Sequence, residues 1–214
     1  MKKSLFSTLV LALLVITGCS YNANVGTVQN VNVYSAYEQK IPGTFALIIN
    51  ADRSMLNPTI KASSYACSFH KYPMTFDDGF IASMKSANES IFGAIISRTN
   101  IPTVAEMQKD ALAGYIVIQS KMFEPRIRFI EGFFSMSSTA TVTIGIDYSV
   151  RDRQNNLILT GSLSAERSAD GDAGAFCDKG IGTLTEATQK AMRELLERYN
   201  ERLSNSEKLR QAFK

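Results

Sequence analysis

Cysteine and histidine are the residue types in this chain that most readily do chemistry, and both are scarce. The 214 residues include three cysteines, Cys19, Cys67 and Cys177, and a single histidine, His70. Cys67 and His70 are three residues apart, so on a strand their side chains would lie on opposite faces. This spacing disfavours a Cys–His nucleophilic dyad, and we interpret His70 as a surface histidine beside a disulfide. Because a metal centre or a triad needs several such groups, we expect no catalytic residue, no metal and no cofactor.

Two further segments have the composition of binding loops but lack the required spacing. Asp170-Gly171-Asp172 is similar to part of a calcium loop, but the other ligands and the closing Glu of an EF-hand are missing. Gly174, Gly180 and Gly182 fit neither the GxGxxG pattern nor a P-loop. We therefore interpret the first segment as a solvated turn and predict no nucleotide site.

Basic residues alternate with phenylalanines in one segment, which is a candidate contact surface. Its members are Lys121, Phe123, Arg126, Arg128, Phe129, Phe133 and Phe134. Such a segment could contact lipid headgroups, lipopolysaccharide phosphates or a partner protein. The favoured alternative is that the aromatic residues fill a sheet–helix interface while Arg126 and Arg128 point outward. If Phe133 and Phe134 are instead exposed in a loop, they mark a contact site.

The first residues of the chain form an export signal. Lys2 and Lys3 precede an apolar run, Leu5–Ile16, of about twelve residues, which suits a signal peptide. A bilayer-spanning helix needs roughly twenty. The following pattern, Ile16-Thr17-Gly18-Cys19, resembles the bacterial lipobox. That resemblance implies diacylglycerol on Cys19, cleavage before it and acylation of the new amino group. An ordinary secretory signal that ends by chance in cysteine is the alternative.

Lipidation of Cys19 would also fix the location and the charge of the mature protein. Ser20 stands where lipoproteins retained in the inner membrane have Asp, so the resemblance implies an outer-membrane protein anchored on the periplasmic face. Without Lys2 and Lys3, the 23 basic residues fall to 21, against 20 acidic residues. A nearly neutral protein gives no reason to expect nucleic acid as a partner.

Cys67 and Cys177 are then the two cysteines of the folded body. An even pair in an exported protein favours a disulfide. Two separate thiols remain the alternative.

Apolar periodicity predicts two amphipathic helices. The first opens at Asp77, an expected N-cap, with apolar residues every three or four positions: Phe80, Met84, Ala87, Ile91 and Ile95. The second starts near Thr183, where the spacing of a capping box recurs. A short helix from Thr103 to about Leu112 has the same signal.

Period-two alternation predicts the strands. It is strict over Thr139–Val150 and resumes over Leu157–Ala165, which predicts a long antiparallel hairpin. A polar loop is expected at Ser168–Gly174. Further strands are predicted at Phe45–Ile49, Ser64–Phe69, Tyr115–Ser120 and Ile127–Phe134.

The element order predicts an α+β two-layer sandwich, with a largely antiparallel sheet of four to six strands packed by two amphipathic helices. We divide the chain into a signal peptide (1–18), a lipidated polar tether (19–44), a single domain (45–203) and a polar tail (204–214). The tail is expected to fray, and the alternative is that Leu209 and Phe213 prolong the last helix.

The lipobox, the polar tether and this element order resemble small outer-membrane lipoproteins of Gram-negative bacteria. The LptE-like, YajG-like and transport-auxiliary PqiC-like groups share this plan. The resemblance implies a non-catalytic accessory or adaptor in envelope transport, secretion or assembly, with an envelope protein as partner. A lipid-anchored hydrolase and a lipid carrier are the alternatives, and the sequence nominates no carboxylate pair for the hydrolase.

Overall fold

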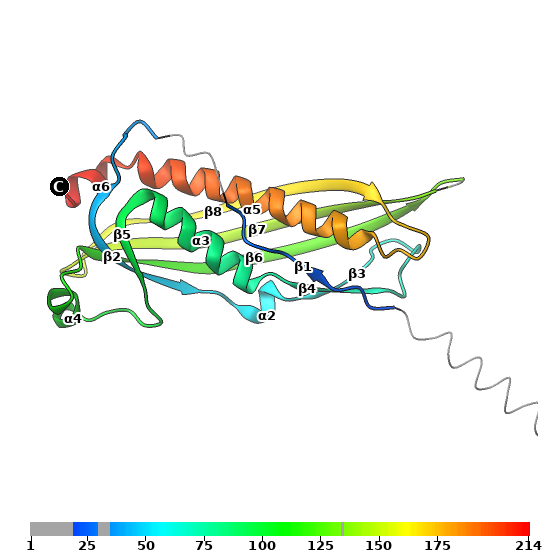
Figure 1. The fold of residues 1–214 in the computed structure, drawn as a ribbon, viewed down its shortest axis with the longest axis horizontal. Helices are drawn as coiled ribbons and strands as arrows, with labels where there is room; N and C mark the ends of the chain where they lie inside the picture. Colours follow the sequence, from blue (N-terminus) through cyan, green and yellow to red (C-terminus); the bar gives the residue numbers. More distant parts are fainter. Residues whose placement is uncertain (1–18, 30–34, 134) are drawn as a thin grey trace, which may run out of the picture.

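The computed structural model describes residues 19–29, 35–133 and 135–214, so the expected signal peptide and Phe134 lie outside the described residues. The strands are β1 (Ala23–Asn24), β2 (Ile41–Asn50), β3 (Thr59–Lys61), β4 (Lys71–Thr75), β5 (Phe92–Ser97), β6 (Gly114–Glu131), β7 (Met136–Asp152) and β8 (Leu157–Asp172). The helices are α2 (Arg53–Leu56), α3 (Asp77–Ile91), α4 (Val104–Lys109), α5 (Gly180–Ser204) and α6 (Glu207–Ala212). Figure 1 shows an elongated body in which the long strands and α5 run along one axis.

A five-stranded sheet in the order β5-β2-β6-β7-β8 forms one layer of the fold. The long strands β6, β7 and β8 are antiparallel, whereas β2 pairs in parallel with β5 and with β6. The predicted hairpin is confirmed, and both of its strands are longer than expected. The two strands expected around 115–134 form the single strand β6, with a bulge between Ser120 and Met122. Pro125 lacks a backbone N–H. It is tolerated in β6 because β2 pairs with β6 only as far as Gln119, so the proline interrupts no hydrogen bonds between β2 and β6.

Helices α3 and α5 form the second layer, and the predicted α+β sandwich is confirmed. α5 packs on β7 and β8, with α3 beside it (Figure 1). The inward positions of β7 are buried as their alternation predicts, and they are Ala140, Val142, Ile144, Ile146, Tyr148 and Val150. Between the layers, the fully buried hydroxyl of Tyr199 donates a 2.9 Å hydrogen bond to Asn88 Oδ1, which joins α5 to α3.

The first amphipathic helix ends earlier than its apolar stripe predicts. α3 stops at Ile91, and the expected continuation to Ile95 is wrong because residues 92–97 form β5. Parallel pairing with β2 accounts for the change, since Ile95 lies opposite Phe45 in that ladder. The expected N-cap is also displaced. Asn57 Oδ1 accepts from the backbone N–H groups of Phe76 and Asp77, so a residue distant in sequence satisfies the helix start.

Three further boundaries differ from the predictions. Residues 64–69 form turns instead of a strand, and Cys67 has a left-handed φ of 62°. The expected loop at 168–174 is wrong in its first part because β8 continues to Asp172. α5 starts at Gly180, so Thr183 lies inside the helix, where its hydroxyl is 2.7 Å from Ser138 Oγ. The capping box that we predicted at Thr103 is confirmed.

Both ends of the described chain pack on the body. Strands β1, β4 and β3 form a separate three-stranded sheet in the order β1-β4-β3, and Val25 and Val28 are buried. The expected tether is therefore docked over residues 19–29. At the other end, the expected frayed tail forms α6, with Leu209 and Phe213 buried. These apolar residues account for the ordered tail.

Candidate functional site

Cys19 lies at the surface of the folded body, at the start of the docked segment. Its backbone carbonyl accepts a 3.2 Å hydrogen bond from the N–H of Lys71, and Tyr21 N–H donates to the Lys71 carbonyl at 2.9 Å. These bonds align the segment parallel to β4, and the pairing continues through Ala23 and Asn24 in β1. The Cys19 side chain is exposed and forms no disulfide. A group attached there would leave the body directly, without a spacer.

A disulfide between Cys67 and Cys177 ties two loops together near Cys19. The S–S distance is 1.98 Å, and the bond closes a separation of 110 residues. Met136 Sδ lies 3.4 Å from Cys67 Sγ and 3.9 Å from Cys177 Sγ, so the start of β7 packs on the bond. The disulfide thus gathers residues 62–70, residues 173–179 and the β6–β7 hairpin at one end of the molecule.

Hydrogen bonds fix the 173–179 loop against the docked segment. The hydroxyl of Tyr21 donates to the Phe176 carbonyl at 2.8 Å, and that of Tyr72 donates to the Cys177 carbonyl at 3.0 Å. Burial raises the pKa of Tyr72, which keeps its hydroxyl protonated as a donor. At the start of the loop, the hydrogen bond from Lys179 lowers the pKa of Asp172, which favours their ion pair.

Among the described residues, four aromatic side chains at the same end of the molecule are highly exposed. Tyr65 is 91% exposed, Phe69 75%, Phe133 93% and Phe176 74%. Sequence reasoning identified Phe133 but assigned Tyr65 and Phe69 to a strand and did not consider Phe176. The sequence does contain one indication of these exposed residues: an aromatic residue lies within two residues of each disulfide cysteine.

The basic and aromatic segment of β6 is divided between two faces of the sheet. Phe123 and Phe129 are buried, whereas Arg126 and Arg128 alternate outward and are exposed. Arg126 forms an ion pair with Glu124 at 2.9 Å. The phenylalanines therefore fill the interior, as the favoured alternative proposed. Phe133 is the exposed aromatic residue of this group, and Phe134 lies outside the described residues.

The polar groups considered for catalysis or metal binding are not assembled into such sites. The Cys67 sulfur is bonded to Cys177, and half-buried His70 packs against the Tyr21 ring with 5.4 Å between centroids. Residues 170–172 end β8, where Asp170 accepts from the hydroxyl of Thr139. The expected turn is therefore a strand. Over residues 19–29, 35–133 and 135–214, no cluster of three or more His, Cys, Asp or Glu side chains could hold a metal.

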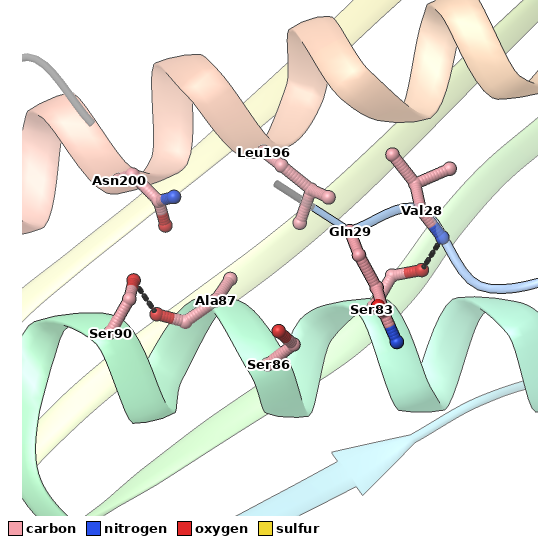
Figure 2. Close-up of a pocket in the computed structure, with 8 residues that line it drawn as sticks. All are labelled: Val28, Gln29, Ser83, Ser86, Ala87, Ser90, Leu196 and Asn200. Carbon is pink, nitrogen blue, oxygen red and sulfur yellow. Dashed lines mark hydrogen bonds between the residues drawn. The ribbon is translucent and has the colours of Figure 1, made fainter. Parts of the chain in front are cut away.

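A polar cleft of about 250 Å³ lies between α3 and α5 (Figure 2). Ser83 Oγ accepts a 2.9 Å hydrogen bond from Val28 N–H, which holds the docked segment across one end of the cleft. Asn200 is buried, and its Oδ1 has no hydrogen-bond partner among the described residues. Serine hydroxyls and the amides of Gln29 and Asn200 suit a small polar molecule or water better than a lipid chain.

No family model matches the sequence, and no curated protein matches it either. Solved structures give distant likenesses. A protein from Xanthomonas campestris described by the family model DUF330 is 10% identical, with 85% of this chain and 91% of that chain covered and a TM-score of 0.44. A minor lipoprotein from Acinetobacter baumannii is 12% identical, with 75% and 90% covered and a TM-score of 0.36. A lipoprotein from Neisseria meningitidis is 11% identical, with 72% and 99% covered and a TM-score of 0.36. We carry over no activity from any of them.

None of the helices in the described part of the chain is both long and apolar enough to cross a bilayer.

The Cys67–Cys177 bond gives the first test. Replacing both cysteines by serine should lower the free energy of unfolding by about 4–5 kcal/mol, because the bond closes a loop of this length in the unfolded chain. Urea unfolding followed by circular dichroism measures the loss. Dithiothreitol should destabilise the parent protein by a similar amount and leave the Cys67→Ser/Cys177→Ser variant unchanged. Equal stability of the parent protein with and without dithiothreitol, together with two free thiols after unfolding, would contradict the disulfide.

Proposed function

We propose that this chain is a bacterial lipoprotein, anchored through lipid on Cys19 to the periplasmic face of the outer membrane. We propose that it acts there as a non-catalytic accessory protein in envelope transport, secretion or assembly. The observation that carries the proposal is Cys19 itself. It ends the Ile16-Thr17-Gly18-Cys19 pattern, and its exposed side chain begins the segment that docks on β4.

Lipid on Cys19 would hold the protein firmly at a membrane. Each acyl methylene group that enters the bilayer contributes about 0.8 kcal/mol, so the two or three chains of a mature lipoprotein make release negligible. The exposed position of Cys19 supports this anchor, because its side chain is at the surface, where acyl chains can extend away from the body.

The exposed face of the long strands supports a role in binding a polar partner. On this outer sheet face, hydroxyl and carboxylate groups bond across β7 and β8, in the pairs Thr139–Asp170, Thr141–Ser168 and Thr143–Glu166. Arg126 and Arg128 extend it onto β6. Cross-strand bonds hold these side chains in fixed positions before binding, which reduces the entropy lost on association.

The packing between the layers favours this role over that of a lipid carrier. A carrier needs an apolar cavity between helices and sheet. In the described chain the side chains of Phe80, Met84 and Tyr199 fill that space and are fully buried. A lipid-anchored hydrolase stays the alternative. The photocrosslinking test below includes turnover of cell-wall substrates as the outcome that would favour it.

The anchor is tested by Cys19→Ala in the full chain, produced in a Gram-negative host with radiolabelled palmitate. We expect the parent protein to incorporate label and to remain in the membrane fraction after a high-salt wash. The variant should incorporate none and should leave the membrane, because it lacks the thiol that receives the lipid. Radiolabel in the Cys19→Ala variant, or no radiolabel in the parent protein, would contradict the proposed anchor. Cys67→Ser/Cys177→Ser, which retains Cys19, is the matched control and should incorporate label.

The accessory role is tested by site-specific photocrosslinking in intact cells. A photoreactive residue at Arg126 or Thr141 on the outer sheet face should crosslink to one envelope protein in a stoichiometric complex. The same residue at Lys190 serves as the control, because Lys190 lies on the exposed face of α5 and pairs with Glu186. Mass spectrometry identifies the partner. No crosslink from either sheet position, combined with turnover of muropeptides by the purified protein, would replace the accessory role with that of a hydrolase.

A further inference from the structure

The four exposed aromatic side chains, Tyr65, Phe69, Phe133 and Phe176, lie in loops at the end of the body from which Cys19 extends. We call their surface the aromatic end. Tyr65 and Phe69 lie in the loop that contains Cys67, and Phe176 precedes Cys177. In Figure 1 these loops and the β6–β7 tip lie at the same end of the molecule as β1, opposite α4 and the C-terminus.

Specific contacts connect the aromatic end to the lipidation residue. Lys71, which follows the Cys67 loop, bonds to the Cys19 carbonyl, and Tyr21 bonds to the Phe176 carbonyl. The β6–β7 tip belongs to the same surface, because Gly132 and Phe176 line one open cleft of about 760 Å³. Phe133 is next to Gly132 in this tip, which a 2.7 Å bond from Gly132 N–H to the Ser135 carbonyl closes.

Exposure of four aromatic rings at one end is costly in water. Burying a large apolar side chain contributes about 1.5–3 kcal/mol, so a surface that covers these rings gains several kcal/mol. Apolar patches of this kind mark contact sites. Tyrosine is enriched at the boundary between lipid headgroups and acyl chains, and phenylalanine is among the residues on the apolar face of segments that lie in this interface.

We propose that the aromatic end rests in the headgroup layer of the membrane that holds the Cys19 lipid. The inference builds on the proposed anchor and adds the surface through which the folded body meets the bilayer. Because residues 19–29 are docked, the lipid holds this end next to the bilayer at a high effective concentration. Any other occupant of the surface would have to displace a membrane already in contact.

The charges around the aromatic end indicate what kind of bilayer it contacts. Lys71 and Lys179 are basic, Glu131, Asp172 and Asp178 are acidic, and all five are exposed. Since basic residues do not outnumber acidic ones here, attraction to anionic lipid contributes little. Contact therefore depends on the aromatic rings, and it occurs on zwitterionic as well as on anionic membranes.

This contact orients the protein. The long strands run along the axis of the body, so with the aromatic end on the membrane, α4 and the β7–β8 turn point away from it (Figure 1). The outer sheet face then lies exposed along the side of the molecule, where a partner in the periplasm reaches it.

The test uses the absence of tryptophan from the chain. Phe69→Trp, Phe133→Trp and Phe176→Trp each introduce one tryptophan at the aromatic end. Leu157→Trp is the matched control, because Leu157 is 50% exposed and lies at the β7–β8 turn. The full-length lipidated variants are reconstituted into phosphatidylcholine vesicles with and without brominated acyl chains. Urea unfolding confirms that each variant keeps the stability of the parent protein.

We expect brominated lipid to quench the three aromatic-end variants roughly threefold more than Leu157→Trp, since interfacial side chains lie ~5–10 Å deep. Quenching should persist in 0.5 M salt, about the concentration at which surface attraction is screened. Equal quenching of all four variants would overturn the inference, as would protection of the aromatic end by a protein partner in place of lipid. Mass spectrometry of the N-terminal peptide separates the two proposals, because an acylated protein without quenching contradicts only this one.

Discussion

The backbone pairing of residues 19–25 with β4 is the constraint on which the functional account depends. It converts the segment expected as a flexible tether into part of the three-stranded sheet, so that the position of Cys19 is fixed relative to the body. A free linker of this length would reach some tens of ångströms and would leave the orientation of the body undetermined. With the segment docked, the lipid that we propose on Cys19 would define one end of the molecule as the end that faces the membrane.

The disulfide and the long sheet connect the docked segment rigidly to the rest of the fold. Cys67–Cys177 joins the turn before β4 to the loop before α5, so the small sheet and the main helix are covalently connected at the end where Cys19 lies. From there, β6, β7, β8 and α5 extend along the body and are joined by the buried core between the layers. The position of Cys19 is thereby fixed relative to the outer sheet face, on which Arg126 and Arg128 lie.

The spacing of apolar residues along the chain predicts the strands and helices whose formation does not depend on distant residues. The alternation in β7 and the apolar stripe of α5 are local, and both elements form as expected. β5 was missed because its strand conformation depends on pairing with β2, and the α3 cap was missed because Asn57 supplies it from another part of the chain. Lipidation of Cys19 stays a prediction, and the sequence supports it because the lipobox is a contiguous motif. The aromatic end could not, because exposure of Phe69 and Phe176 depends on turns that the disulfide brings together.

Neutron reflectometry of the lipidated protein on a supported bilayer tests the central claim most directly, which is that the body is held at the membrane through a docked segment and not through a tether. The account predicts protein density that begins within the headgroup layer and extends outward by the long dimension of the body, with no water layer between them. A solvent-filled gap between headgroups and protein, or a protein layer no thicker than the short dimension of the body, would contradict it.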